Sequence, residues 1–135
     1  IPSDAEGRLA IAEKIIQRAA NLGIPADDIV IDPLVLTVGA DQKASSITLQ
    51  TIEMVRREFG VNVNIGASNV SFGLPERDVI NLAFLSMAIY AGATCAITDP
   101  MKYTLHIRAT DLLRGRDENS MRYLKYYRKQ SKKAA

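Results

Sequence analysis

The sequence predicts an α/β protein with a parallel sheet, and two observations support this fold class. Three short runs rich in apolar and β-branched residues recur at intervals of about 32 to 34 residues, at 29–31, 61–65 and 94–97. A segment with helical periodicity follows each run, and another precedes the first. Strands that alternate with helices form parallel sheets, and this interval is typical of a βα barrel. We therefore expect about three βα units, whereas a closed barrel has eight.

The helices are expected between and around these strands. The first helix should begin at Ser3 or Asp4, either of which can cap its N-terminus, and should end before Gly23. Its apolar face is assigned to residues that include Ile15 and Ile16. Further helices are expected at about 45–59, 76–91 and 103–113.

The chain is expected to divide into an α/β region at 1–116 and a basic, tyrosine-rich tail at 117–135. Six lysine or arginine residues and three tyrosines in the tail could contact nucleic acid. The charge of the whole chain is nearly balanced, however, with 17 basic and 15 acidic residues. We therefore interpret the tail as a solvated helix or frayed end, and expect no nucleic-acid partner.

Composition places the chain among soluble globular proteins, with 47% hydrophobic and 24% charged residues. No apolar run approaches the ~20 residues of a membrane span, and no signal peptide is visible, so no membrane partner is expected. The single cysteine excludes an internal disulfide and favours a reducing, cytoplasmic compartment. Ile1 is not an initiator methionine, so we expect that the chain was processed, trimmed or cut from something longer.

Polar residues stand where each predicted strand ends, namely Asp32, Asn69 and Asp99. The carboxyl ends of parallel strands form the ligand-facing edge of βα proteins, so we expect all three side chains at one edge. Asp32 could cap a turn, or it could accept two parallel hydrogen bonds from a ring such as a pterin or a guanine. Asn69 could shape its own loop, or its amide could both donate to and accept from a ligand.

Several other polar residues allow both a structural and a functional interpretation. Arg77 begins a helix, where a cation opposes the helix dipole, so a binding role competes with simple solvation. Gln42 could reach a ligand from the first loop or could only be solvated there. Asp99 is expected to cap a helix or turn, and Cys95 to be a small buried residue. His106 has no partners at ligand spacing, so no metal site is expected.

Several segments resemble the pterin-binding methyltransferases that use methyltetrahydrofolate and a corrinoid (cobalamin) protein. The segments are 31–35, 66–75 with Arg77, 81–85 and 91–100. The resemblance implies a (β/α)8 TIM barrel that binds its pterin at the carboxyl edge of the strands. It also implies that this chain is the C-terminal part of such a barrel, carrying its sixth to eighth strands. The missing N-terminal half, or a second copy of the chain, would then be a partner.

The same resemblance assigns roles to individual residues. Asp32 matches the carboxylate that binds the pterin ring, and Asn69 matches the asparagine near N5, from which the methyl group leaves. Arg77 matches a site arginine, and Ser68 and Gln42 complete the expected substrate-binding set. The implied reaction transfers the methyl group of 5-methyltetrahydrofolate to the cobalt of the corrinoid partner.

Two other functions are compatible with the same fold. The first is a non-catalytic pterin-binding or assembly module that kept the fold. The second is an enzyme like the dihydropteroate synthases, which share the fold. Those enzymes carry Ser-Arg-Lys after the seventh strand, where this chain has Ser68-Asn69-Val70, and the difference counts against that activity. The folate domain of methionine synthase is a closer match.

Overall fold

The computed structural model describes residues 1–134, so Ala135 of the predicted tail lies outside the described residues. The chain divides into two compact units, Ile1–Ile97 and Thr98–Ala135. This division comes earlier than the one expected between 116 and 117. The second unit begins before the basic tail because the helix that precedes the tail packs against the tail helix.

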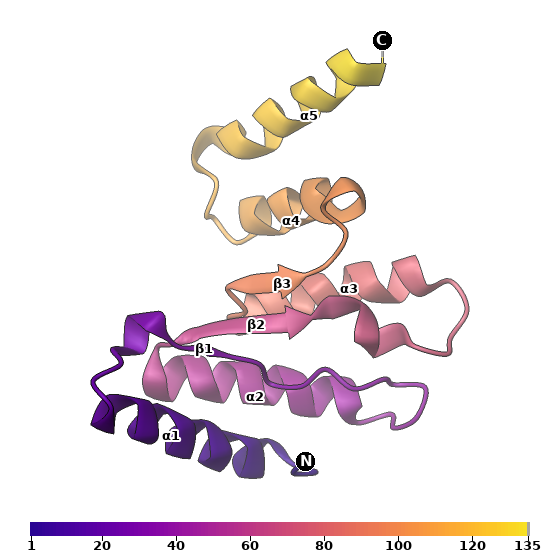
Figure 1. Cartoon of the computed structure of the whole chain (residues 1–135). Coiled ribbons are helices and arrows are strands. Elements are labelled where there is room, and N and C mark those ends of the chain that lie inside the picture. Colours follow the sequence, from indigo (N-terminus) through magenta and orange to yellow (C-terminus); the bar gives the residue numbers. More distant parts are fainter. Residues whose placement is uncertain (135) are drawn as a thin grey trace. The chain divides into compact units, whose positions relative to one another are not determined.

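The first unit contains a three-stranded parallel sheet, as the sequence predicts. The strands are β1 (Val30–Ile31), β2 (Asn62–Gly66) and β3 (Cys95–Ile97), in the order β1-β2-β3. In the register of the sheet, Val30 pairs with Asn62, and Gly66 pairs with Ile97. Figure 1 shows the three strands running side by side. The observed strands lie within one residue of the predicted runs.

Helices precede and connect these strands. They are α1 (Ala5–Asn21), α2 (Ala44–Phe59) and α3 (Arg77–Ala91), with short 3₁₀ turns η1 (Ala26–Asp28) and η2 (Ala67–Ser71). Asp4 caps α1 by accepting a hydrogen bond from the Gly7 N–H at 2.6 Å. Gly60 ends α2 in the left-handed conformation, with φ of 68°. These caps are local signals, which is why the sequence predicts them well.

One face of the sheet carries the core of the first unit. Val63 and Ile65 of β2 are fully buried, as are Ile52 and Val55 of α2. Because strand residues alternate between faces, β2 presents Asn62, Asn64 and Gly66 on the opposite side. We call this side, with the residues that pair there in register (Val30, Cys95 and Ile97), the open face.

The open face is exposed. Val30 is 55% and Ile97 is 70% exposed, although both are large apolar residues. Cys95 is also exposed, so the expectation that it is buried is wrong. The reason is that β3 is an edge strand, and Cys95 lies on its open-face side opposite Asn64. Parallel sheets are normally covered on both faces, so the exposure of large apolar residues on the open face is unusual.

The second unit consists of α4 (Pro100–Leu113), the turn η3 (Glu118–Ser120) and α5 (Met121–Ala134). Helix α4 begins three residues before the predicted start at 103, because Asp99 caps it by accepting the Met101 N–H at 2.9 Å. Pro100 suits the first helical position, where no N–H is needed. The cap interpretation of Asp99 is confirmed. Within 1–134, we find no helix with the length and apolar character to cross a membrane.

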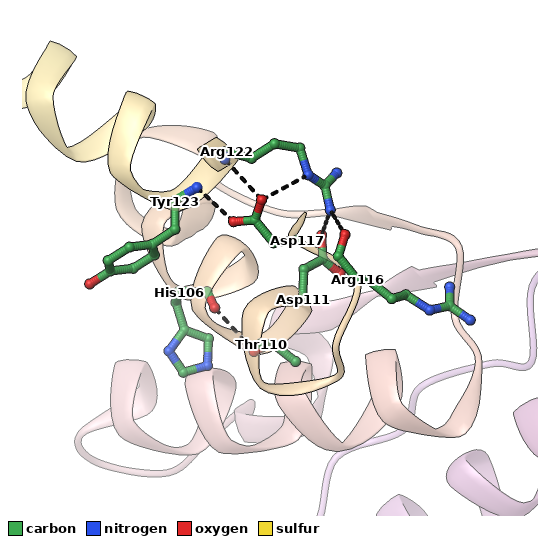
Figure 2. A network of polar contacts seen from close by, with 7 residues as sticks. All are labelled: His106, Thr110, Asp111, Arg116, Asp117, Arg122 and Tyr123. Atoms are coloured by element: carbon green, nitrogen blue, oxygen red, sulfur yellow. Dashed lines mark hydrogen bonds and ion pairs between the residues drawn. The ribbon is translucent and has the colours of Figure 1, made fainter. Parts of the chain in front are cut away.

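A polar network joins the two helices of the second unit (Figure 2). The Asp117 carboxylate accepts the backbone N–H groups of Arg122 and Tyr123, each at 2.9 Å, and so caps α5. The Arg122 guanidinium donates to Asp111 Oδ2 at 3.2 Å and to the Arg116 carbonyl at 2.8 Å. The network therefore ties the start of α5 to the end of α4.

This network predicts a pH dependence. Burial raises the pKa of the Asp117 carboxyl, but the N–H donors of Arg122 and Tyr123 and the nearby guanidinium groups outweigh it, so the pKa lies below its ordinary value. A carboxyl whose pKa is lowered by folding stabilises the fold above its unfolded pKa, and this stabilisation is lost as the pH falls through the folded pKa. We expect helix content to fall on acidification below about pH 4.

Circular dichroism across an acid titration measures this loss. Asp117→Asn should flatten the profile and lower the helix content at neutral pH, because the charged cap is gone. The exposed Asp27 of η1 offers a control, and Asp27→Asn should keep the wild-type profile. An Asp117→Asn protein with an unchanged acid profile would show that Asp117 is not the group responsible.

Candidate functional site

The loops that follow β1 and β2 are joined at the carboxyl edge of the sheet. The Val38 N–H donates to the Val70 carbonyl at 2.9 Å, and Thr37 Oγ1 donates to the Phe72 carbonyl at 2.7 Å. The loop that follows Asp32 is therefore tied to the turn that carries Asn69. Asp99 belongs to the second unit, so the described contacts of this edge come from the first two strands alone.

Asp32 is exposed and follows directly after β1. Its Oδ1 accepts the Leu34 N–H at 2.8 Å, which is the turn-forming role considered above. A carboxylate has about four acceptor positions, so this bond orients the group and leaves it able to bind ring N–H donors. Asp32 also lines a cavity of about 70 Å³ beside α1. Ligand sites usually enclose at least roughly 300 Å³, so this cavity is too small to hold a pterin.

Arg8 of α1 supports the turn at Asp32, a role that its position in the sequence does not indicate. Arg8 is 7% exposed, and its Nη1 donates to the carbonyls of Pro33 and Leu34, each at 2.9 Å. Thr48 Oγ1 donates to the same Leu34 carbonyl at 3.1 Å. Leu34 has φ of 63°, a strained value for a residue with a side chain. Arg8 therefore stabilises a strained turn next to Asp32.

Replacing this buried guanidinium should destabilise the protein. Arg8→Met keeps much of the apolar stem but removes the guanidinium donor of the Pro33 carbonyl and one of the two donors of the Leu34 carbonyl. We expect the free energy of unfolding to fall by about 1–3 kcal/mol, the usual cost of leaving buried polar groups unpaired. Urea denaturation measures the change, and Arg18→Met, at an exposed position on the same helix, is the matched control. Equal stability of the two variants would contradict the role given to Arg8.

Asn69 lies in η2, directly after β2, and is exposed. Its carbonyl accepts the Phe72 N–H at 3.2 Å, which closes the turn. Its side-chain amide lies against Gly66, the last residue of β2. The amide therefore stands at the carboxyl end of the central strand, the position that the sequence predicted for it.

Arg77 binds the turn that carries Asn69. Its Nε donates to Ser71 Oγ at 3.0 Å, and its Nη2 donates to the Ser68 carbonyl at 2.8 Å. The guanidinium also lies 5.9 Å from the centroid of the Phe72 ring. Ser71 is fully buried, and its Oγ donates to Asn81 Oδ1 at 2.7 Å. Arg77, Ser71 and Asn81 thus form a clamp that holds η2 against α3, and a direct contact of Arg77 with substrate stays a prediction.

The other two predicted binding residues are Ser68 and Gln42. Ser68 is exposed and contributes its carbonyl to the clamp. Gln42 is exposed in the loop before α2, and within residues 1–134 no hydrogen bond joins it to Asp32 or Asn69. In the same part of the chain, no group of three His, Cys, Asp or Glu side chains is arranged to hold a metal ion. Asp32 and Asn69 are therefore the predicted residues whose loops the structure brings together.

A family model and two named relatives match most of this chain. Residues 5–99 match the family described as "Pterin binding enzyme". The chain is 28% identical over 131 residues to a methylcorrinoid:tetrahydrofolate methyltransferase of Eubacterium limosum, an alignment that covers 95% of this chain and 48% of that protein. It is 35% identical over 106 residues to a methionine synthase of Mycobacterium tuberculosis, covering 73% of this chain and 9% of that protein. The chain thus spans about half the length of the first relative, and less of the second. Since the family match covers most of its length, the chain belongs to the pterin-binding enzymes.

Proposed function

We propose that this chain is the C-terminal part of a barrel enzyme that transfers a methyl group between N5 of tetrahydrofolate and the cobalt of a corrinoid protein. One observation carries the proposal: Asp32 and Asn69 stand in neighbouring loops, tied by the Val38–Val70 and Thr37–Phe72 hydrogen bonds, at the carboxyl edge of a parallel sheet. Both residues lie inside the segment that matches the pterin-binding family. The names of the two relatives support the methyl-transfer chemistry.

Asp32 would recognise the pterin ring. A pterin presents a ring N–H beside an exocyclic amino group, and a carboxylate accepts both in parallel. The Leu34 N–H holds Oδ1, so the carboxylate has a defined orientation before the ligand arrives. Preorganisation of this kind lowers the entropic cost of binding.

Asn69 would act at the reacting nitrogen. A tertiary amine is a poor leaving group, so the methyl group leaves N5 more readily when N5 gains a proton or a strong hydrogen bond. An amide cannot supply the proton itself, but it can stabilise the charge that develops at N5. In the reverse direction the same amide would face the same atoms, so one site serves both directions of transfer.

The three strands form only one arc of such a barrel. A closed (β/α)8 barrel needs eight strands, and the open face here exposes Val30 and Ile97. The chain also spans 48% of the Eubacterium limosum relative. We propose that the remaining strands come from a further segment of the same protein or from a partner chain. The assembly of this chain with those strands is called the complete enzyme below.

The affinity of the complete enzyme for methyltetrahydrofolate tests the proposal. Asp32→Ala should lose roughly 1.5–3 kcal/mol of binding free energy, the scale of a hydrogen bond to a charged group. That loss corresponds to a dissociation constant about 10- to 150-fold higher, as measured by calorimetry. Asp27→Ala, in the exposed turn η1, is the control and should bind like the wild type. Unchanged affinity of Asp32→Ala would refute the role given to Asp32.

A further inference from the structure

Gly66 differs from Gly60 and Gly73 in its backbone conformation and in the space around its Cα atom. Gly60 and Gly73 adopt positive φ, and a Cβ added to either would meet nothing within 4 Å, so conformation explains them. Gly66 has φ of −81°, a value that ordinary residues adopt. Its conformation therefore does not require glycine.

The Asn69 side chain occupies the space beside Gly66. A Cβ at this position would lie 2.9 Å from Asn69 Nδ2 and 3.6 Å from Asn69 Cγ. A separation below 3.0 Å forces one of the two groups to move. The volume that a side chain would fill at residue 66 is thus occupied by the Asn69 amide.

The missing side chain of Gly66 lies on the open face of the sheet. Gly66 alternates with the buried Val63 and Ile65 and pairs with Ile97, so a Cβ there would project from the open face. The Asn69 amide therefore lies over the end of β2 on the open face. In a closed barrel this face is the interior, next to the ligand-binding edge.

We infer that Gly66 is a positioning residue for Asn69: its missing side chain lets the amide lie over the end of β2, where it meets N5 of the folate. The action of the amide at N5 rests on the proposed function. The effect of Gly66 on the position of the amide does not.

Hydrogen bonds hold the backbone of η2 in place, so the turn cannot easily move away from a side chain at residue 66. Arg77 holds the Ser68 carbonyl at 2.8 Å, and buried Ser71 is bonded to Asn81 at 2.7 Å. Because the clamp fixes η2 on both sides of Asn69, a methyl group at residue 66 should displace the side-chain amide rather than the turn. Displacing a catalytic group by about 1 Å can cost on the order of 10²-fold in rate.

The complete enzyme allows a test by a double-mutant cycle. We expect Gly66→Ala to lower kcat about 10- to 100-fold while KM for methyltetrahydrofolate changes less than about threefold. When Asn69 is already alanine, adding Gly66→Ala should change kcat less than about twofold. Gly60→Ala, which strains the end of α2 away from Asn69, controls for lost stability and should keep kcat near the wild-type value.

Two results of the cycle would overturn the inference. One is a Gly66→Ala enzyme with wild-type kcat. The other is an equal loss of kcat from Gly66→Ala in the wild-type and Asn69→Ala backgrounds, because residue 66 would then act independently of Asn69.

A second measurement separates this inference from the proposed function. The side-chain amide of Asn69 can be followed by NMR in enzyme labelled with ¹⁵N-asparagine, and assigned by its loss in Asn69→Ala. Gly66→Ala should shift that resonance, and Gly60→Ala should not. A shift in an enzyme that transfers no methyl group would refute the proposed function and support the positioning role. An unshifted resonance would overturn the positioning role whether or not the enzyme is active.

Discussion

The 135-residue chain by itself is expected to show no turnover of methyltetrahydrofolate with a reduced corrinoid protein. Its sheet has three strands, so a pterin at Asp32 and Asn69 would be held from one side and exposed to water on the other. Water around the site weakens each electrostatic contribution to catalysis. Two copies would supply six strands, fewer than the eight that closure needs.

Formation of methyl-cobalt, followed by absorbance, measures this turnover. The same assay on the complete enzyme is the positive control, and the reverse assay from methylcorrinoid and tetrahydrofolate covers the other direction. The isolated chain is also expected to associate through β1, β3 and the open face, because unpaired strand edges recruit partners. Turnover by the isolated chain, with its mass confirmed as that of the 135 residues, would show that the further strands are dispensable. The proposal that the site needs a complete barrel would then be wrong.

In the complete enzyme, Asn69→Ala is expected to lower kcat about 10²- to 10³-fold, the usual effect of removing one hydrogen-bonding group that stabilises developing charge. The dissociation constant of methyltetrahydrofolate should rise much less, because the bond to N5 strengthens as the nitrogen becomes protonated. Single-turnover kinetics and calorimetry separate the two quantities.

Asn62 provides the matched control for this substitution. It is an exposed asparagine on the open-face side of β2, at the opposite end of the strand from Asn69. Asn62→Ala should therefore leave kcat close to the wild-type value. If both variants lose kcat equally, or if Asn69→Ala weakens binding as much as it slows transfer, Asn69 does not stabilise the transition state.

The structure corrects the expected core face of the first helix. The apolar pattern placed Ile15 on the buried side, but Ile15 is 50% exposed, while Ala5, Arg8 and Ala12 are buried. An arginine is a poor candidate for a core position when only the sequence is read. Its burial depends on carbonyl groups that lie 25 and 26 residues further along the chain.

Local patterns were sufficient for the order of strands and helices. Period-two and period-3.6 hydrophobicity, the Asp4 and Asp99 caps and the Gly60 terminator act within a few residues of each other, so the sequence alone predicts them. The placement of Asp32 and Asn69 at strand ends follows from the predicted positions of the strands that precede them.

Tertiary packing decided how those polar residues are held. Three sets of contacts join segments that are distant in the sequence and meet only on folding. They are the Arg8 contacts with the Leu34 turn, the two hydrogen bonds between the loops and the clamp of η2 against α3. The exposure of Cys95 likewise depends on β3 being an edge strand. Neither hydrophobic period nor capping encodes such contacts, because their free energy arises from side chains that are distant in sequence and become neighbours only when the sheet and helices pack.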